Sequence, residues 1–256
     1  TITIDCKESV NSITLHCAEL KIESCHIRHA KTLQKAVIKT DTKKEEITIT
    51  VKNKIKGQAF IEIEFTGELN DRLLGFYRSQ YKQNGETKYL ATTQFEAADA
   101  RRAFPCWDEP QVKATFDISI IAENKFTAIS NMPVLSKKQI KNKVLYTFAK
   151  TPVMSTYLIY LGVGEFEYLS SNVGKIQVRV ITTKGNKSKG KYSLEIGKKL
   201  LVSYEKYFGI KYPLPKLDLI AIPDFAAGAM ENWGAITFRE TILLYDPRTS
   251  STKTKQ

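Results

Sequence analysis

Hydrophobic and polar residues alternate in short runs through the first two-thirds of the chain. Alternate residues of a strand face opposite sides of a sheet, so this period predicts strands with one buried face. Turn residues such as Asn84-Gly85 separate the runs. The spacing favours a mainly β, mostly antiparallel region. The predicted strands are Ile47–Val51, Ala59–Phe65, Ala114–Ile121, Val144–Phe148, Tyr157–Val163 and Ile176–Thr182.

The pattern changes near Gly174. Apolar residues recur at helical spacing between Lys189 and Tyr207, and Gly209 follows as a stop signal. Two strand-like runs then flank a loop, from Leu217 to Ile222 and from Ala235 to Phe238. We therefore expect two domains, residues 1–173 and residues 174–256.

The loop between these last two strands contains the motif Gly228-Ala229-Met230-Glu231-Asn232, followed by Trp233-Gly234. A fixed carboxylate in a closed cleft can recognise a free α-ammonium by charge-assisted hydrogen bonding. It also rejects internal peptide segments, which would leave it unpaired. The glycine lets the backbone approach a peptide closely. Taken alone, the motif also fits a simple turn with a solvated glutamate.

A second segment, from Gln94-Phe95-Glu96-Ala97 to Pro110, contains a further carboxylate beside the pair Arg101-Arg102. On the residues alone, Glu96 could simply be a surface group near these arginines. Together the two segments resemble the signatures of the gluzincin zinc aminopeptidases, the family of aminopeptidase N, puromycin-sensitive aminopeptidase and the tricorn-interacting aminopeptidases. Further segments match in the same order, at 128–133, 151–158 and 207–216.

The resemblance implies roles for particular residues. Glu231 and Glu96 would bind the substrate amino terminus, and two convergent carboxylates are best explained by a cation between them. Gln94 would line the pocket for the first side chain. The resemblance also implies a cis peptide bond between Glu96 and Ala97. The remaining motif residues would line or support the first subsites: Gly228, Ala229, Met230 and Asn232.

The same resemblance implies a saddle-shaped N-terminal domain of antiparallel and mixed sheets. The first helix and strands of a thermolysin-like α+β catalytic domain would follow. In this family two histidines of a His-Glu-x-x-His helix and a later Glu hold zinc. The chain has three histidines, His16, His26 and His29, and none precedes a Glu. We therefore expect an N-terminal part of a longer enzyme, with the first strands missing and no catalytic or metal-binding residues of its own.

These expectations place zinc in the full-length parent, with none bound to this chain, which would be inactive alone. Its partners would be peptide substrates, bound through their free N-terminus. A half-formed cleft with an exposed apolar wall favours self-association. The alternative is a non-catalytic, β-rich protein that binds peptide amino termini as a pseudoenzyme or scaffold. The zinc ligands of the parent would separate the two hypotheses.

Charge and cysteine content add limits. The formal net charge is +12, but the basic clusters are rich in lysine and lack interleaved stacking aromatics, so solvated faces explain them better than nucleic-acid binding. Apolar runs are too short to span a membrane. The four cysteines show no spacing of a secreted framework, which favours reduced thiols and a cytoplasmic location. Cys25 and His26 are neighbours on a predicted strand, so they face opposite sides and are a poor metal site.

Overall fold

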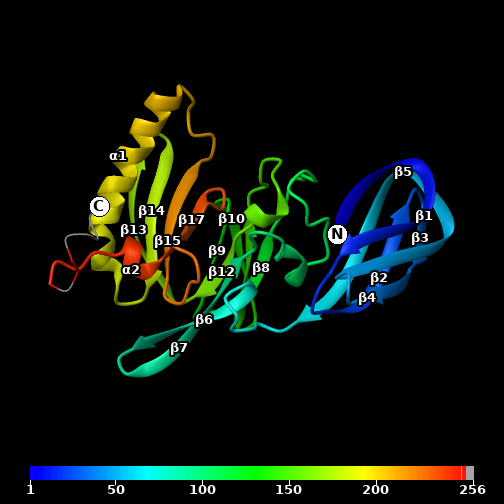
Figure 1. The fold of residues 1–256 in the computed structure, drawn as a ribbon, viewed down its shortest axis with the longest axis horizontal. Helices are drawn as coiled ribbons and strands as arrows, with labels where there is room; N and C mark the ends of the chain where they lie inside the picture. The colour runs from blue at the N-terminus through cyan, green and yellow to red at the C-terminus, as the bar shows by residue number, and fades with distance from the viewer. Residues whose placement is uncertain (249, 252–256) are drawn as a thin grey trace.

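The computed structural model describes residues 1–248, 250 and 251, which form four β-sheets and one long helix. In Figure 1 the N-terminal sheet lies on the right, two smaller sheets lie in the middle, and the sheet that carries the helix lies on the left. The chain therefore crosses the molecule from one end to the other in sequence order.

The N-terminal sheet has five antiparallel strands and an aliphatic core. The isoleucines and leucines that alternate along its strands are the residues that its inner face buries, among them Leu15, Ile27 and Ile61. The strands are β1 (Ile2–His16), β2 (Leu20–His29), β3 (Thr32–Lys35), β4 (Val37–Asp41) and β5 (Glu46–Gly67), and β5 pairs with β1, β2 and β4.

Strand β5 differs from the sequence prediction. The two runs Ile47–Val51 and Ala59–Phe65 belong to one strand of 22 residues. Its pairing with β1 shifts register between Cys6 and Val10 and again between Val10 and Ser12, as β-bulges do. Such bulges let a strand bend without ending, so the break in hydrophobic alternation was wrongly interpreted as a boundary between strands.

The middle of the molecule contains two antiparallel sheets. One has the order β6 (Gly75–Gln83), β7 (Glu86–Gln94), β12 (Leu161–Gly164) and β9 (Thr127–Ser130). The other has the order β10 (Val134–Ile140), β11 (Lys143–Phe148) and β8 (Ser119–Glu123). The turn predicted at Asn84-Gly85 joins β6 and β7, where both residues have positive φ.

Two predicted strands in this region begin too early. Strand β8 begins at Ser119, and Ala114 makes only an isolated bridge to Met154. Strand β12 begins at Leu161, because Thr156–Leu158 forms a turn of 3-10 helix. The short helices Ala100–Arg102 and Lys187–Gly190 have the same form. Apolar side chains of these loops are buried in the core although their backbones do not pair as strands. Hydrophobicity alone does not distinguish such a buried loop from a strand.

The last sheet is mixed and carries the helix α1 (Lys191–Phe208) on one face (Figure 1). Its strands are β13 (Phe166–Val173), β14 (Ile176–Thr183), β15 (Lys216–Ile222), β16 (Ala229–Met230) and β17 (Ala235–Arg239), and the short helix α2 (Glu240–Leu243) follows them. Strands β14, β15 and β17 run parallel, and α1 is the crossover that connects β14 to β15. Gly209 ends the helix with φ of 66°, as predicted.

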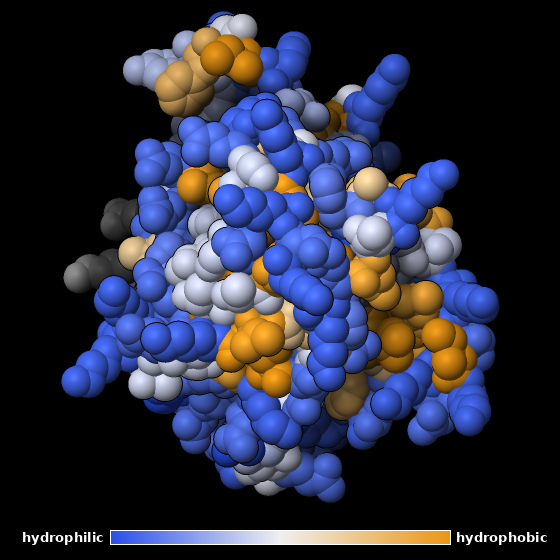
Figure 2. Space-filling view, turned by 90° about the vertical axis from the view of Figure 1, so that its right-hand side faces the viewer, coloured by the Kyte–Doolittle hydropathy of each residue, from blue (hydrophilic) through white to orange (hydrophobic). Residues whose placement is uncertain are grey.

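The predicted fold class is confirmed: curved antiparallel sheets precede a helix and the strands of an α/β unit. Figure 2 views the molecule from the side of the N-terminal sheet, and this surface is mostly hydrophilic with scattered small hydrophobic patches. None of the helices in the described part of the chain is long and apolar enough to cross a membrane.

Candidate functional site

The motif loop runs from the end of β15 to the start of β17, residues 223–234, and its second half returns along β17 as the edge strand β16. Arg239 at the end of β17 holds the first half of the loop. Its guanidinium donates to the carbonyl oxygens of Phe225 and Ala226, and its backbone N–H donates to Gly228 O at 3.0 Å. Carbonyl groups of this irregular segment thus have hydrogen-bond donors in Arg239.

Exposure alternates among the motif residues in a way that displays the carboxylate. Gly228, Ala229 and Glu231 are exposed, whereas Met230 and Asn232 are buried. The Asn232 amide donates to Thr237 Oγ1 at 3.3 Å. Glu231 is therefore presented to solvent between two buried anchors, and Met230 supports the loop from within the core.

Two further ties connect the motif loop to the middle sheet. At its start, the Tyr77 hydroxyl donates to Asp224 O at 3.0 Å, and Asp224 N–H donates to Ser79 Oγ at 2.9 Å. At its end, the fully buried Asn131 donates from its amide to Trp233 O at 2.9 Å. Both ends of the loop are therefore fixed by residues of β6 or of the segment after β9.

The second segment begins at Gln94, the last residue of β7. Phe95 is fully buried, Glu96 is exposed, and the peptide bond between Glu96 and Ala97 is cis, which confirms the expectation. The side-chain oxygen of Gln94 is buried and lacks a hydrogen-bond partner among the described residues. A buried acceptor of this kind is uncommon and can be satisfied by a ligand.

One hydrophobic cluster joins the two segments. Phe95 and Met230, each the residue before a motif glutamate, are both fully buried in it. Ile159 and Ile222 also belong to this cluster, so the middle sheet and the last sheet share one core. The backbones that carry Glu96 and Glu231 are consequently fixed within the same packed unit.

The arginine pair near Glu96 has other partners. Arg101 pairs with Asp108 at 3.1 Å and with Glu45 at 3.2 Å, and Arg102 pairs with Glu45 and Asp99, each at 2.8 Å. Arg102 also contacts Glu19. These ion pairs fasten the segment after Glu96 to the N-terminal sheet, so Glu96 is not held by the arginines.

Neither Glu96 nor Glu231 takes part in a salt bridge among the described residues; the pairs involve other carboxylates. Two carboxylates without cationic partners, on backbones fixed in one core, are chemically suited to accept a cation with several N–H donors.

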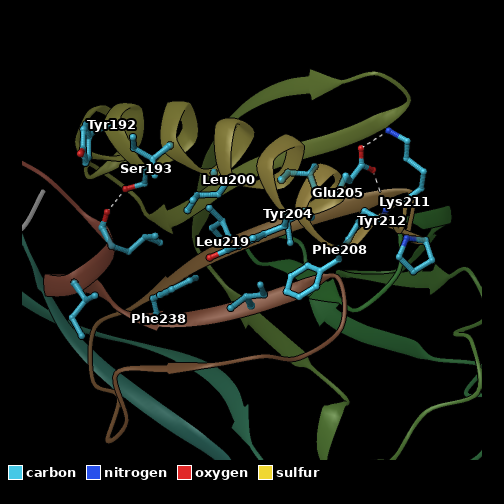
Figure 3. Close-up of a pocket in the computed structure, with 18 of the residues that line it drawn as sticks. Tyr192, Ser193, Leu200, Tyr204, Glu205, Phe208, Lys211, Tyr212, Leu219 and Phe238 are labelled. Atoms are coloured by element: carbon cyan, nitrogen blue, oxygen red, sulfur yellow. Dashed lines mark hydrogen bonds and ion pairs between the residues drawn. The ribbon is translucent and has the colours of Figure 1, made fainter. Parts of the chain in front are cut away.

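A large apolar groove lies elsewhere, between α1 and strands β15 and β17 (Figure 3). Its volume is about 1020 Å³, and its lining includes Leu200, Tyr204, Phe208, Leu219 and Phe238. Figure 3 shows the Glu205 carboxylate paired with Lys211 at one end of the groove, at 2.8 Å. No residue of either motif segment lines this groove, so it is a feature separate from the candidate site.

Within the described ranges, no cluster of three or more His, Cys, Asp or Glu side chains could hold a metal ion. Two of the three histidines make hydrogen bonds that connect separate segments of the chain. His16 Nδ1 accepts from Asp108 N–H at 3.0 Å, and His29 Nε2 lies 2.8 Å from Lys56 O. All four cysteines are free thiols, and burial raises the pKa of Cys17 and of Cys25 to about 11.

Sequence reasoning missed the residues that support the loop. Asn131 lies in a segment that was matched to the family without a role. Lys216 and Asp218 are charged residues in a run that is otherwise apolar and whose every residue is buried. A Lys-x-Asp pair on such a strand places both charged side chains on one face of the sheet. This pattern in the sequence could have predicted a buried ionic cluster.

Comparison with known proteins agrees with this architecture. Residues 1–158 match the Peptidase M1 N-terminal domain, and residues 192–256 match the Peptidase family M1 domain. The chain is 46% identical to the puromycin-sensitive aminopeptidase of Caenorhabditis elegans, over the whole chain and 28% of that protein. It is 49% identical to Aminopeptidase M1 of Arabidopsis thaliana, over 78% of the chain and 23% of that protein.

These matches indicate the class of protein: the aminopeptidase metalloproteases, which are hydrolases. The chain belongs to the peptidase M1 family. A third relative, Aminopeptidase 2, mitochondrial, of Saccharomyces cerevisiae, is 42% identical over 95% of the chain. The chain spans between a quarter and a third of the length of most of these relatives, for example 28% of the nematode protein and 30% of a rice one.

Gly234 provides a test of how tightly the loop is packed. Its φ is +72°, and an added Cβ would lie 2.4 Å from the backbone oxygen of Asn131. Replacement Gly234→Ala should therefore cost the left-handed strain of about 1–2 kcal/mol and a further cost for moving the loop. Urea unfolding measures the loss of unfolding free energy.

Gly57 is the matched control for this change. Its φ is +78°, and nothing lies within 4 Å of an added Cβ. Gly57→Ala should cost the backbone strain alone. Equal losses in the two variants would show that the loop is not tightly packed against Asn131.

Proposed function

We propose that this chain is the substrate-recognition portion of a zinc aminopeptidase that removes N-terminal residues from peptides. The observation that carries the proposal is the pairing of the two segments in one core. Phe95 and Met230 are both fully buried in it, and each precedes an exposed glutamate that has no ionic partner among the described residues. Glu96 and Glu231 would hold the substrate α-ammonium by charge-assisted hydrogen bonds.

The neighbouring residues fit the rest of a peptide terminus. The unpartnered oxygen of Gln94 supports a role in the pocket for the first side chain. Strand β16 is the terminal strand of its sheet, so its outer edge can pair with an extended peptide laid along Gly228 and Ala229. Met230 and Asn232 would support these subsites from below, since both are buried.

We further propose the two-domain organisation of residues 1–173 and 174–256. The gap between the two family matches, residues 159–191, contains this boundary. Strand β13 pairs along its whole length with β14 across that boundary, so the two domains would share an ordered hairpin and move little against each other.

The residues that the structure describes do not form a site for the zinc ion of the proposed enzyme. Carboxylate, imidazole and thiolate groups do not converge in threes within the described residues. We therefore assign the metal and the general base to the remainder of a longer protein, and we expect the 256-residue chain alone to be inactive. Our proposal of a cytoplasmic location is supported by the four free cysteines.

Peptide binding by the chain itself tests the recognition role. We expect an alanine tetrapeptide amide with a free amino terminus to bind more tightly than its N-acetylated form. Glu231→Gln and Glu96→Gln should each reduce this preference about tenfold or more, since a charged hydrogen bond contributes about 1.5–3 kcal/mol. NMR titration measures the dissociation constants.

Glu8→Gln is the matched control, because it removes one exposed carboxylate from β1 in the N-terminal sheet. It should leave the preference unchanged. An equal affinity for the free and the acetylated peptide in the wild-type chain would contradict recognition of the amino terminus.

Catalysis is tested by sequencing the gene on the 3′ side of the Gln256 codon. We expect it to encode His-Glu-x-x-His and a later Glu, and the longer protein to release N-terminal residues in a reaction that chelators stop. If these ligands are absent while the free peptide still binds, the protein recognises amino termini without cleaving them, which is the alternative function.

Self-association of the isolated chain is the last part of the proposal. The groove between α1 and β17 leaves Ile210 70% exposed and Phe208 64% exposed, and apolar surface of this kind favours contact with a second copy. Ile210→Lys should reduce the dimer fraction measured by light scattering. Val37→Lys, at an equally exposed position on β4, is the control and should not change it. A purely monomeric wild-type chain at high concentration would contradict this prediction.

A further inference from the structure

A buried ionic cluster lies beneath the end of the motif loop. Arg179 on β14 makes two hydrogen bonds to Asp218 on β15, Nε to Oδ1 and Nη2 to Oδ2, both at 2.6 Å. The Lys216 ammonium donates to Asp218 Oδ2, also at 2.6 Å. Asp218 is fully buried, and Lys216 is 2% exposed. The cluster contains two cations and one anion, so one positive charge is in excess.

This excess charge is not required to neutralise Asp218. The guanidinium of Arg179 already binds both carboxylate oxygens, which is the strongest geometry for such a pair. Burial lowers the pKa of Lys216, opposed by the neighbouring Asp218, so keeping the ammonium charged in this place costs free energy. An apolar side chain of similar volume is often as stable as a buried ion. A contribution to folding stability therefore does not explain why a lysine occupies position 216.

The second hydrogen bond of Lys216 gives the explanation. Its ammonium donates to Gly234 O at 2.6 Å. Gly234 ends the turn that follows Glu231, in which Ala235 N–H donates to Asn232 O at 3.0 Å. Trp233 O in the same turn accepts from Asn131, so each carbonyl of the turn has a donor.

Among these donors only Lys216 carries a charge. We propose that Lys216 is a positioning residue, which fixes the turn after Glu231 through Gly234 O and thereby sets the position of the Glu231 carboxylate. The role in substrate binding rests on the proposed function, whereas the fixing of the turn does not. Asp218 and Arg179 hold the ammonium in place for this task.

The variant Lys216→Met separates positioning from stability. It leaves the neutral Arg179–Asp218 pair intact, and Gly234 O keeps the backbone N–H of Asp218 at 3.1 Å, so no buried group loses its last partner. We expect an unchanged or higher melting temperature. The free-amine tetrapeptide should bind about tenfold more weakly, and the N-acetylated peptide should bind as before.

A second measurement, by NMR, follows the motif loop in the absence of peptide. The chain has two tryptophans. The indole NMR signal of Trp233 reports the turn, and that of Trp107 reports the core of the N-terminal sheet, against which Trp107 packs. Lys216→Met should shift the Trp233 signal and speed hydrogen exchange of the Ala235 amide, with Trp107 unchanged. Lys216→Arg, which keeps a charged donor, should restore part of both effects.

Lys88→Met is the matched control. Lys88 is partly buried, whereas Lys216 is almost fully buried, and Lys88 pairs with Glu165 at 3.0 Å instead of with a residue of the motif loop. It should change neither the Trp233 signal nor the preference for the free amine. If Lys216→Met fails to fold, Lys216→Gln replaces it, because the amide stays polar but is one atom shorter.

The outcomes distinguish the two proposals. If the wild-type chain shows no preference for the free peptide, recognition by this chain fails, and a turn released by Lys216→Met still supports the positioning role. If the Trp233 signal, the Ala235 exchange rate and the affinity all keep their wild-type values in Lys216→Met, the positioning role is overturned.

Discussion

The candidate site depends on hydrogen bonds from side chains of neighbouring elements to the backbone of the motif loop. Residues 223–228 and 231–234 have no strand ladder of their own, and buried backbone groups without partners are costly. Arg239 and Lys216 supply charged donors from the last sheet, while Tyr77 and Asn131 supply neutral donors from the middle of the molecule. A loop held in this way can present an exposed carboxylate without being free to move.

The second carboxylate is fixed by a different kind of interaction. Phe95 is anchored in the hydrophobic core, and the residues after Glu96 are fastened to the N-terminal sheet by the arginine pair. Glu45 receives both Arg101 and Arg102, and the arginine side chains are less than one-fifth exposed. Partly buried ion pairs of this kind define geometry more than they add stability. They hold the segment after Glu96 against the N-terminal part of the molecule.

Much of the fold could be predicted from the sequence because local patterns decide it. The helical period and Gly209 located α1, and the strands that flank the motif loop follow from short apolar runs. The long strand β5 was divided wrongly, because bulges interrupt alternation without ending a strand. The site residues came from motifs, but their supports did not. Nothing in the local sequence of Asn131 tells which carbonyl its amide reaches, since Trp233 lies 102 residues further along the chain.

The bond between the Tyr77 hydroxyl and Asp224 O joins residues that are 147 positions apart. A ribosome adds about 5–20 residues per second, so the strand that carries Tyr77 leaves it roughly 7 to 30 seconds before its partner. Until then the middle sheet lacks one wall of its core, and contacts of such long range also form slowly. The candidate site is consequently among the last parts of this chain to assemble during synthesis. An early nascent chain would carry Glu96 at the end of β7 without the motif loop and its Glu231.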